Sequence, residues 1–407
     1  MNMHRGRGTT GRAAAAALAM ALAALLLVGC GPRPGAATAA ALPPGGEPVP
    51  MRHARLVEVV RYPGYTAVRV AGPVAAAGGG TAPAADTVVL VPREAPLPAL
   101  PAALADAPVL RTPVRTIATN AGADEAFLSQ LGLAQRLVAV GGLASYDPAI
   151  RGRTLAGELA QVGYNWHAPP NLDVLVARRP DVFLMRLGSL DHAGALARAR
   201  RLGIPVLPTF AEDEPHYLGR AEWMRVYGLL AGEAEAADRL FAEIEARVDA
   251  LRRQAAARPR VPVLWAYPDG ADRWVATVRG AEGRFLADAG GRNLLARPER
   301  DGAFSSDVVS TEALLPLAGQ AQVWILGDLH AVPPRNLAPL ADFRAWRDGR
   351  LYGNTGRIDP GANAYDWYQT GIARPDWVLQ DFVKALHPDL VEAPFAFLKP
   401  LPPGTFR

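Results

Sequence analysis

The chain has 407 residues, half of them hydrophobic, which is enough to bury the cores of two ordinary domains. Its 43 basic and 39 acidic residues give a formal net charge of +4, a near-neutral balance that excludes the strongly basic surface of a nucleic-acid-binding protein. The single cysteine, Cys30, excludes an internal disulfide.

Residues 1–30 predict an export signal followed by a lipid anchor. Three arginines within residues 5–12 precede an apolar run, 13–28, that is too short for a convincing membrane span. The run ends in Leu-Val-Gly-Cys, which resembles the lipobox of bacterial lipoproteins, where the cysteine is lipidated. The alternative is an ordinary signal peptide with an incidental cysteine. We expect lipidation at Cys30, and a protein in the periplasm or at the cell surface that meets the membrane only through this anchor.

The segment after the signal predicts a tether and then short strands. Residues 31–54 are rich in Ala, Gly and Pro, a composition typical of flexible linkers. Residues 65–70 and 87–91 have strand-like patterns and belong to a group of short extra strands at 56–91. The Ala/Gly-rich insert at 75–85 is expected to be a solvent-exposed loop.

From residue 114 onwards β-like and α-like patterns alternate, which predicts a parallel sheet covered by helices on both faces. We assign residues 55–217 to an N-terminal α/β lobe. Its expected strands are 114–118, 137–140, 181–185 and 205–208, and its expected helices are 123–131 and 192–202.

Residues 218–258 contain no proline and have apolar side chains at spacings of three and four. This pattern predicts one long connecting helix, or two helices with a break near Gly232. About 35 helical residues would reach roughly 50 Å, longer than one small lobe.

Alternation resumes in a C-terminal α/β lobe, 259–400, with expected strands 261–265 and 323–326 and expected helices 283–289, 311–317 and 377–386. The predicted fold class is therefore α/β, with two Rossmann-like three-layer lobes of parallel sheets joined by one long inter-lobe helix.

Several segments resemble one known family in their order and spacing. They read N-L-D-V-L-V-A-R-R-P-D-V (171–182), G-I-P-V (203–206), F-L-A-D-A-G-G-R-N (285–293) and V-S-T-E-A-L (309–314). Together they resemble the iron–siderophore and vitamin B12 family of substrate-binding proteins, the class III periplasmic-binding-protein type. The resemblance implies a two-lobed clamp that captures a small-molecule metal complex (iron–siderophore, haem or cobalamin) and delivers it to an ABC importer permease. We expect a monomer, because such a cleft needs no partner chain.

The resemblance also assigns a docking role to Asp173 and Glu312. In the family, one acidic residue on each lobe pairs with arginines of the permease, and these two positions match. Asp173 departs from the more usual glutamate, which shortens its reach by one methylene group. The alternative from the residues alone is that each carboxylate sits near a helix N-terminus, where the helix dipole favours negative charge.

A cleft for chelates or macrocycles needs flat apolar walls with a few polar groups. Aromatic residues in the loops after strands are the natural candidates, because ligands of open α/β sheets bind beyond the carboxyl ends of the strands. Packing between or within the lobes is the alternative for each of them. The candidate ligand-binding residues are Tyr146, Trp166, Trp265, Tyr267, Arg279, Tyr365 and Trp367; Arg151, Arg153 and Arg357 could also pair with an anionic ligand.

Other functions remain open as alternatives. A direct metal-ion binding protein would need converging ligands, yet the histidines are scattered without paired spacing, and only His167 and His216 are candidates to meet. An exported lipid-anchored hydrolase, or a sensor on the same fold, is the other class. The sequence has no Gly-x-Ser-x-Gly, His-Glu-x-x-His or phosphate-binding glycine motif, so we expect no enzyme, no cofactor and no resident metal.

Overall fold

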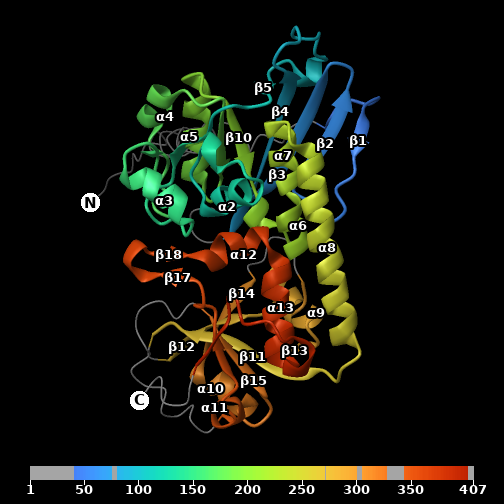
Figure 1. Cartoon of the computed structure of the whole chain (residues 1–407), viewed down its shortest axis with the longest axis vertical. Coiled ribbons are helices and arrows are strands. Elements are labelled where there is room, and N and C mark those ends of the chain that lie inside the picture. Colours follow the sequence, from blue (N-terminus) through green and yellow to red (C-terminus); the bar gives the residue numbers. More distant parts are fainter. Residues whose placement is uncertain (1–40, 76–79, 271, 300–304, 328–342, 402–407) are drawn as a thin grey trace, which may run out of the picture.

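The computed structural model describes residues 41–75, 80–270, 272–299, 305–327 and 343–401. Two α/β lobes are stacked along the long axis, and one long helix runs beside their junction (Figure 1). This arrangement confirms the predicted fold class. No helix in the described ranges is both long and apolar enough to cross a membrane.

An N-terminal sheet, which we call the appended sheet, precedes the first lobe. Its strands follow the order β1-β2-β3-β4-β5, antiparallel up to β4, with β5 parallel to β4. One face packs on the core of the first lobe, and the segment 93–108 covers part of the other. The strands are β1 (Glu47–Val49), β2 (Val57–Tyr62), β3 (Tyr65–Ala75), β4 (Thr81–Pro92) and β5 (Val109–Thr112).

The appended sheet corrects the loop expected at 75–85. The β3–β4 pairing continues from Ala71 opposite Ala85 to Ala75 opposite Thr81. Alanine and proline have low strand propensity, so the sequence pattern favoured a loop. Pairing with the neighbouring strand satisfies the backbone groups of this segment, and that tertiary gain overrides the local preference.

The first lobe contains a fully parallel sheet in the order β10-β9-β6-β7-β8. The strand expected at 137–140 is confirmed at its predicted bounds, whereas the one expected at 114–118 is displaced to Ile117–Thr119. The strands are β6 (Ile117–Thr119), β7 (Leu137–Val140), β8 (Ala160–Gln161), β9 (Val182–Arg186) and β10 (Val206–Thr209); the helices are α2 (Gly122–Gln130), α3 (Pro148–Leu155), α4 (Leu172–Arg178) and α5 (Leu190–Arg201).

The connection between the lobes is divided into α6 (Tyr217–Glu222), α7 (Met224–Ala231) and α8 (Ala234–Ala256), so the single helix expected over 218–258 is corrected. Gly232 ends α7 with φ +74°, a left-handed conformation that favours glycine. The alternative with a break near Gly232 is therefore the one observed. Helix α8 alone, with 23 residues, spans about 35 Å beside the lobe junction.

The second lobe has a mixed sheet rather than the parallel one that was predicted. Strands β13, β11, β15 and β16 are parallel, while β12, β14 and β19 pair antiparallel at its edges. The strands are β11 (Val261–Pro268), β12 (Arg273–Thr277), β13 (Gly291–Asn293), β14 (Ser306–Ser310), β15 (Val323–Leu326), β16 (Leu351–Gly353) and β19 (Lys399–Pro400), with a separate hairpin of β17 (Ile358–Asp359) and β18 (Ala364–Tyr365); the helices are α9 (Gly280–Asp288), α10 (Thr311–Leu314), α11 (Arg344–Arg347), α12 (Thr370–Ala373) and α13 (Pro375–Leu386).

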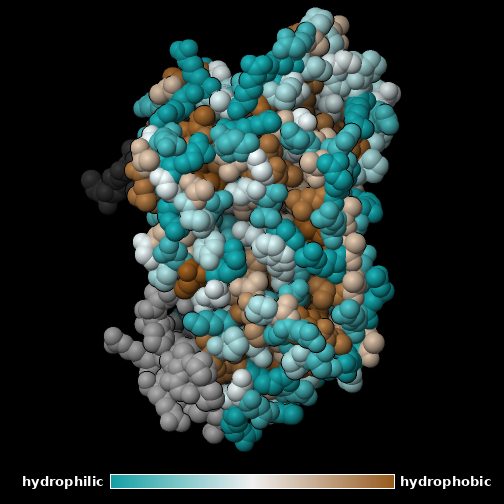
Figure 2. Space-filling view, in the orientation of Figure 1, coloured by the Kyte–Doolittle hydropathy of each residue, from teal (hydrophilic) through white to brown (hydrophobic). Residues whose placement is uncertain are grey.

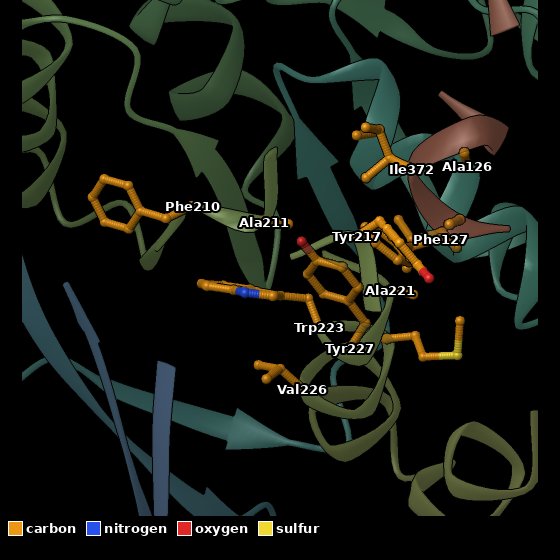
Figure 3. Packing of buried hydrophobic residues seen from close by; sticks show 14 of the residues in the cluster. Ala126, Phe127, Phe210, Ala211, Tyr217, Ala221, Trp223, Val226, Tyr227 and Ile372 are labelled. Carbon is orange, nitrogen blue, oxygen red and sulfur yellow. The ribbon is translucent and has the colours of Figure 1, made fainter. Parts of the chain in front are cut away.

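The hydrophobic core is continuous from the first lobe through α6 and α7 into the second. Figure 3 shows Trp223 and Tyr227 of this connection among side chains of the first lobe, with Ile372 of α12 close to Ala126 of α2. The Trp223 indole N–H donates to the buried Glu214 carboxylate at 2.9 Å. The outer face shown in Figure 2 is mostly hydrophilic, and hydrophobic residues there are interrupted by polar ones. A shared core of this kind favours small rotations of the lobes over wide opening.

Candidate ligand-binding site

The first lobe directs the loops after its parallel strands towards the second lobe. These loops follow β6, β7, β8 and β10 and carry most of the residues of the first lobe that line the cavities at the junction. The carboxyl edge of a parallel sheet is where α/β proteins bind ligands, because helix N-termini and adaptable loops meet there.

A cavity of about 620 Å³, which we call the aromatic cavity, lies between the lobes. Trp166 of the first lobe has 55% of its surface exposed and stacks on Tyr164, with ring centroids 5.6 Å apart at 17°. Tyr365 and Tyr368 line it from the second lobe. The full lining is Gly122, Ala144, Tyr164, Asn165, Trp166, Glu212, Asn363, Tyr365, Tyr368 and Gln369. Its volume and aromatic walls suit a flat ligand of drug size or larger.

Glycine at position 141 lets Tyr164 lie against the end of β7. A Cβ atom at Gly141 would stand 2.1 Å from the Tyr164 ring, so any other residue would displace the ring. The Tyr164 hydroxyl donates to the carbonyl of Gly142 at 3.3 Å. The stack that presents Trp166 to the cavity is thus fixed by the first lobe itself.

Gln369 joins the lobes at one wall of the aromatic cavity. Its side-chain oxygen accepts from the N–H of Tyr146 and its amide group donates to the carbonyl of Ala144, both at 2.8 Å. The residue is 9% exposed. A second inter-lobe contact, the ion pair of Arg151 with Asp359 at 2.9 Å, lies on the same side of the junction. These contacts hold the lobes in the arrangement that forms the cavity.

A second cavity of about 580 Å³, the charged cavity, shares Glu212 with the aromatic one. Arg186 pairs with Asp213 at 2.9 Å, and Arg220 pairs with Glu282 of the second lobe at 2.7 Å. Burial raises the pKa of Asp213 to about 6, although Arg186 opposes the rise. The two cavities therefore form neighbouring compartments, one aromatic and one ionic.

Two buried carboxyl groups lie in the first turn of α2, behind the aromatic cavity. Burial raises the pKa of Asp124 to about 6, and the hydroxyl of Tyr227, which donates to it at 2.6 Å, opposes the rise. Burial raises the pKa of Glu125 to about 7. Neither Glu125 oxygen has a well-formed hydrogen bond, and the nearby hydroxyls of Ser145 and Tyr164 only reduce the rise.

The structure brings two of the predicted ligand residues together. Trp166 and Tyr365 face the same aromatic cavity from different lobes. Tyr146 lines a smaller space of about 260 Å³ on the other side of Gln369, where the Arg357 guanidinium lies 4.8 Å from its ring centroid. Arg279 lines the charged cavity and pairs with Asp307 at 3.6 Å.

Other predicted residues lie elsewhere. Trp265 and Trp367 are buried, 3% and 8% exposed, and Trp265 packs 5.1 Å from the ring of Phe382, so both tryptophans serve the core and line neither cavity. Tyr267 ends the same strand as Trp265 and is not among the lining residues of either cavity. The structure thus favours the packing alternative for the two tryptophans.

Two predicted arginines have structural partners in the first lobe. Arg153 donates to the carbonyls of Ala134 and Leu137, and Arg151 donates to that of Ser145 in addition to its inter-lobe ion pair. The sequence analysis missed Tyr164, Glu212, Tyr368 and Gln369. Tyr164 lies two residues before Trp166, and Tyr368 and Gln369 follow Trp367 directly, so a wider window around each predicted aromatic residue would have included three of the four.

The two predicted docking carboxylates lie on different lobes. Asp173 and Glu312 are exposed in the first turns of α4 and α10, and Figure 1 places these helices in the upper and lower lobe. The side chain of Asn171 caps α4 by accepting from the N–H of Asp173 at 3.1 Å. Cys30 and the rest of the predicted signal lie outside the described residues.

The histidines do not meet as the metal alternative required. The ring of His216 lies 5.7 Å from that of His53, whereas the ring of His167 lies 4.0 Å from that of Trp166, tilted by 33°. Across the described ranges no group of three or more His, Cys, Asp or Glu side chains could hold a metal ion.

The fold is that of a two-lobed α/β protein with cavities between its lobes. The family profile described as periplasmic binding protein matches residues 117–342, and the chain belongs to that family. It is 23% identical over 251 residues to an uncharacterized lipoprotein of Methanocaldococcus jannaschii, covering 57% of this chain and 54% of that protein, so it spans about half the length of this relative.

Solved structures share the fold. A periplasmic haem-binding protein from Pseudomonas aeruginosa superposes with a TM-score of 0.54 at 20% identity, covering 70% of this chain and 97% of that chain. The periplasmic vitamin B12 binding protein of Vibrio cholerae superposes with a TM-score of 0.51 at 18% identity, covering 68% and 98%. At these identities the likeness establishes the architecture alone.

Proposed function

We propose that this protein is the lipid-anchored, extracytoplasmic substrate-binding component of an ABC importer. It captures a metal complex (haem, a cobalamin or an iron–siderophore) between its lobes and delivers it to the permease. The single observation that carries the proposal is the aromatic cavity, where the Tyr164–Trp166 stack of one lobe faces Tyr365 and Tyr368 of the other.

Physical chemistry supports a large flat ligand over a bare ion. Aromatic walls contribute through burial of apolar area and through stacking, and neither term helps a small hydrated cation. The exposed ring of Trp166 offers a flat apolar surface that a planar ligand can cover. The fold shared with haem-binding and vitamin B12-binding proteins is consistent with this class of cargo.

Binding is tested by calorimetric titration of the full-length processed protein in detergent with haemin, cyanocobalamin, ferrichrome, ferric ion and zinc ion. We expect saturable binding of one of the three complexes. The variant Trp166→Ala should bind it about tenfold to a hundredfold more weakly. It loses the contact of one aromatic ring with the ligand, and burial of one such side chain contributes roughly 1.5–3 kcal/mol.

The matched control for that experiment is Trp346→Ala, in α11, which lines neither cavity. Its affinity should stay within about twofold of the wild type. Binding of ferric or zinc ion alone would instead favour the direct metal-ion alternative. If none of the five compounds binds, the receptor proposal is refuted and the hydrolase and sensor alternatives are open again.

Docking to the permease is the second element of the proposal. Exposed charges at the rim of an interface act mainly on association rate and orientation, so Asp173 and Glu312, one on each lobe, suit that role. The double variant Asp173→Arg, Glu312→Arg should lose uptake of the cargo in the native host and keep its affinity for the cargo. The control Glu235→Arg reverses an exposed charge on α8. Normal uptake by the double variant would refute the docking role.

A further inference from the structure

The appended sheet precedes the residues that match the family profile, yet it reaches the ligand space. Pro73 and Ala75 of β3 and Thr81 of β4 line the charged cavity. In Figure 1, β3 runs from the outer part of the first lobe towards the junction of the lobes. The opposite side of the cavity is formed by the segment 279–284 of the second lobe.

The paired strands are fixed to the first lobe at the segments that line the cavity. The N–H of Ala75 donates to the carbonyl of Gly188 at 3.2 Å. Gly72 lies so close to Phe210 that a Cβ atom there would stand 2.3 Å from the ring. Further along β4, the buried Asp86 pairs with Arg200 of α5. The strands therefore move with the first lobe rather than independently of it.

The chain just before β2 is attached to the loop that follows β10. The buried Glu214 carboxylate of this loop accepts from the N–H groups of Arg55 and Leu56, at 2.8 and 2.9 Å. Glu214 itself lines the charged cavity beside Asp213. The same loop begins with Phe210, which lies against Gly72 of β3, so two parts of the appended sheet contact one loop of the charged cavity.

The charged cavity is lined by groups that form strong hydrogen bonds. Arg186 and Arg220 bring guanidinium donors, and Glu212 and Asp213 bring carboxylate acceptors. Charged donors and acceptors of this kind favour an occupant with polar groups that can pair with them. Carboxylate, amide or hydroxyl substituents on the edge of a metal complex have that chemistry.

We propose that the paired ends of β3 and β4 set the size limit of the ligand. Pro73, Ala75 and Thr81 form a fixed wall of the charged cavity, and this cavity receives the polar substituents of the ligand. This inference rests on the proposed function. The three side chains are small, so the charged cavity stays open. A large side chain at position 75 would fill it without touching the aromatic cavity.

The test compares Ala75→Trp with Pro63→Trp in the full-length processed protein. Pro63 is exposed, lies in the turn between β2 and β3 and is outside the lining of the cavity, which makes it the matched control within the same sheet. The probe is whichever of haemin, cyanocobalamin and ferrichrome the wild type binds most tightly. We expect Ala75→Trp to bind it at least tenfold more weakly and Pro63→Trp to stay within twofold.

A second pair of measurements separates a size limit from a folding defect. Thr81→Trp should give the same loss as Ala75→Trp, because both positions line the charged cavity. The melting temperature of each variant should match that of Pro63→Trp. Wild-type affinity in both variants would overturn the inference while leaving the proposed function intact. Failure of the wild type to bind any probe would contradict the proposed function, and this inference with it.

Discussion

Replacing Glu125 by glutamine should stabilise the protein at neutral and basic pH. Glu125 is 1% exposed and its oxygens have no well-formed hydrogen bond, so its ionised form is poorly solvated in the fold. Its pKa rises from 4.5 to about 7. Glutamine has nearly the same shape and carries no charge, so it removes the cost of ionisation at this position.

The sign and size follow from proton linkage. Below pH 4.5 the carboxyl group is protonated in both the folded and the unfolded chain, so the substitution changes little. Between pH 4.5 and 7 the unfolded chain has released the proton while the folded chain retains it, and folding stability falls by about 1.4 kcal/mol per pH unit. The accumulated loss at pH 8 is about 3 kcal/mol, an upper limit because the glutamine amide must find acceptors.

Urea unfolding at pH 4.5, 6 and 8 measures this difference. The gap in unfolding free energy between Glu125→Gln and the wild type should be near zero at pH 4.5 and widen to at least 1 kcal/mol at pH 8. The control Glu158→Gln, whose side chain is 61% exposed, should show no such widening. A gap that stays constant with pH would refute the reasoning, because it would mean that Glu125 ionises normally inside the fold.

Three further predictions concern contacts between parts of the chain. Gln369→Leu removes both inter-lobe hydrogen bonds of that residue, which together contribute about 1–3 kcal/mol. The radius of gyration measured by X-ray scattering should therefore rise. An unchanged radius would contradict a role of Gln369 in holding the lobes together. Glu214→Ala leaves the N–H groups just before β2 and the Trp223 indole without their acceptor. The unfolding free energy measured in urea should fall by about 2–4 kcal/mol. Equal stability would show that water replaces the carboxylate as acceptor. Asp381→Ala removes the acceptor for the N–H groups of residues 396–398. The C-terminal segment should then become sensitive to limited proteolysis. The absence of any new cleavage would contradict a role of Asp381 in holding this segment.

The lipid anchor can be tested apart from the fold. Labelled palmitate should enter the wild-type protein in its native host and fail to enter Cys30→Ser, since this is the only cysteine of the chain. Equal labelling of the two would assign the modification to another residue and would leave an ordinary export signal as the alternative for residues 1–30.

Much of the fold was predictable because its strands are short and apolar and are separated by segments whose apolar residues have helical spacing. Residues 137–140 and 323–326 carry continuous apolar runs, and both form strands at the predicted bounds. The antiparallel edges of the second lobe could not be predicted this way. Strand β12, Arg273–Thr277, has a mixed pattern, and its direction depends on the turn before it and on pairing with β14.

The candidate site was predictable only in part. Trp265 ends the expected strand 261–265, and Trp166 follows a Gly-Tyr-Asn segment, but neither local pattern shows whether the ring lines a cavity or packs in the core. In the structure, Trp166 is supported by Tyr164 and open to the cavity, while Trp265 packs on Phe382 inside the second lobe. Burial depends on what the rest of the chain places opposite a side chain, which local sequence does not encode.

The sequence by itself determined the α/β class, the alternation of strands and helices and the segments that resemble the binding-protein family, because these follow from hydrophobic periodicity and local motifs. Only the tertiary structure decided that the Ala- and Pro-rich residues at 71–75 and 81–85 form paired strands, and that these strands reach a cavity between the lobes. The physical reason is that strand pairing and cavity walls arise from contacts between residues far apart in the chain, whose stabilisation outweighs the weak local preferences of the residues concerned.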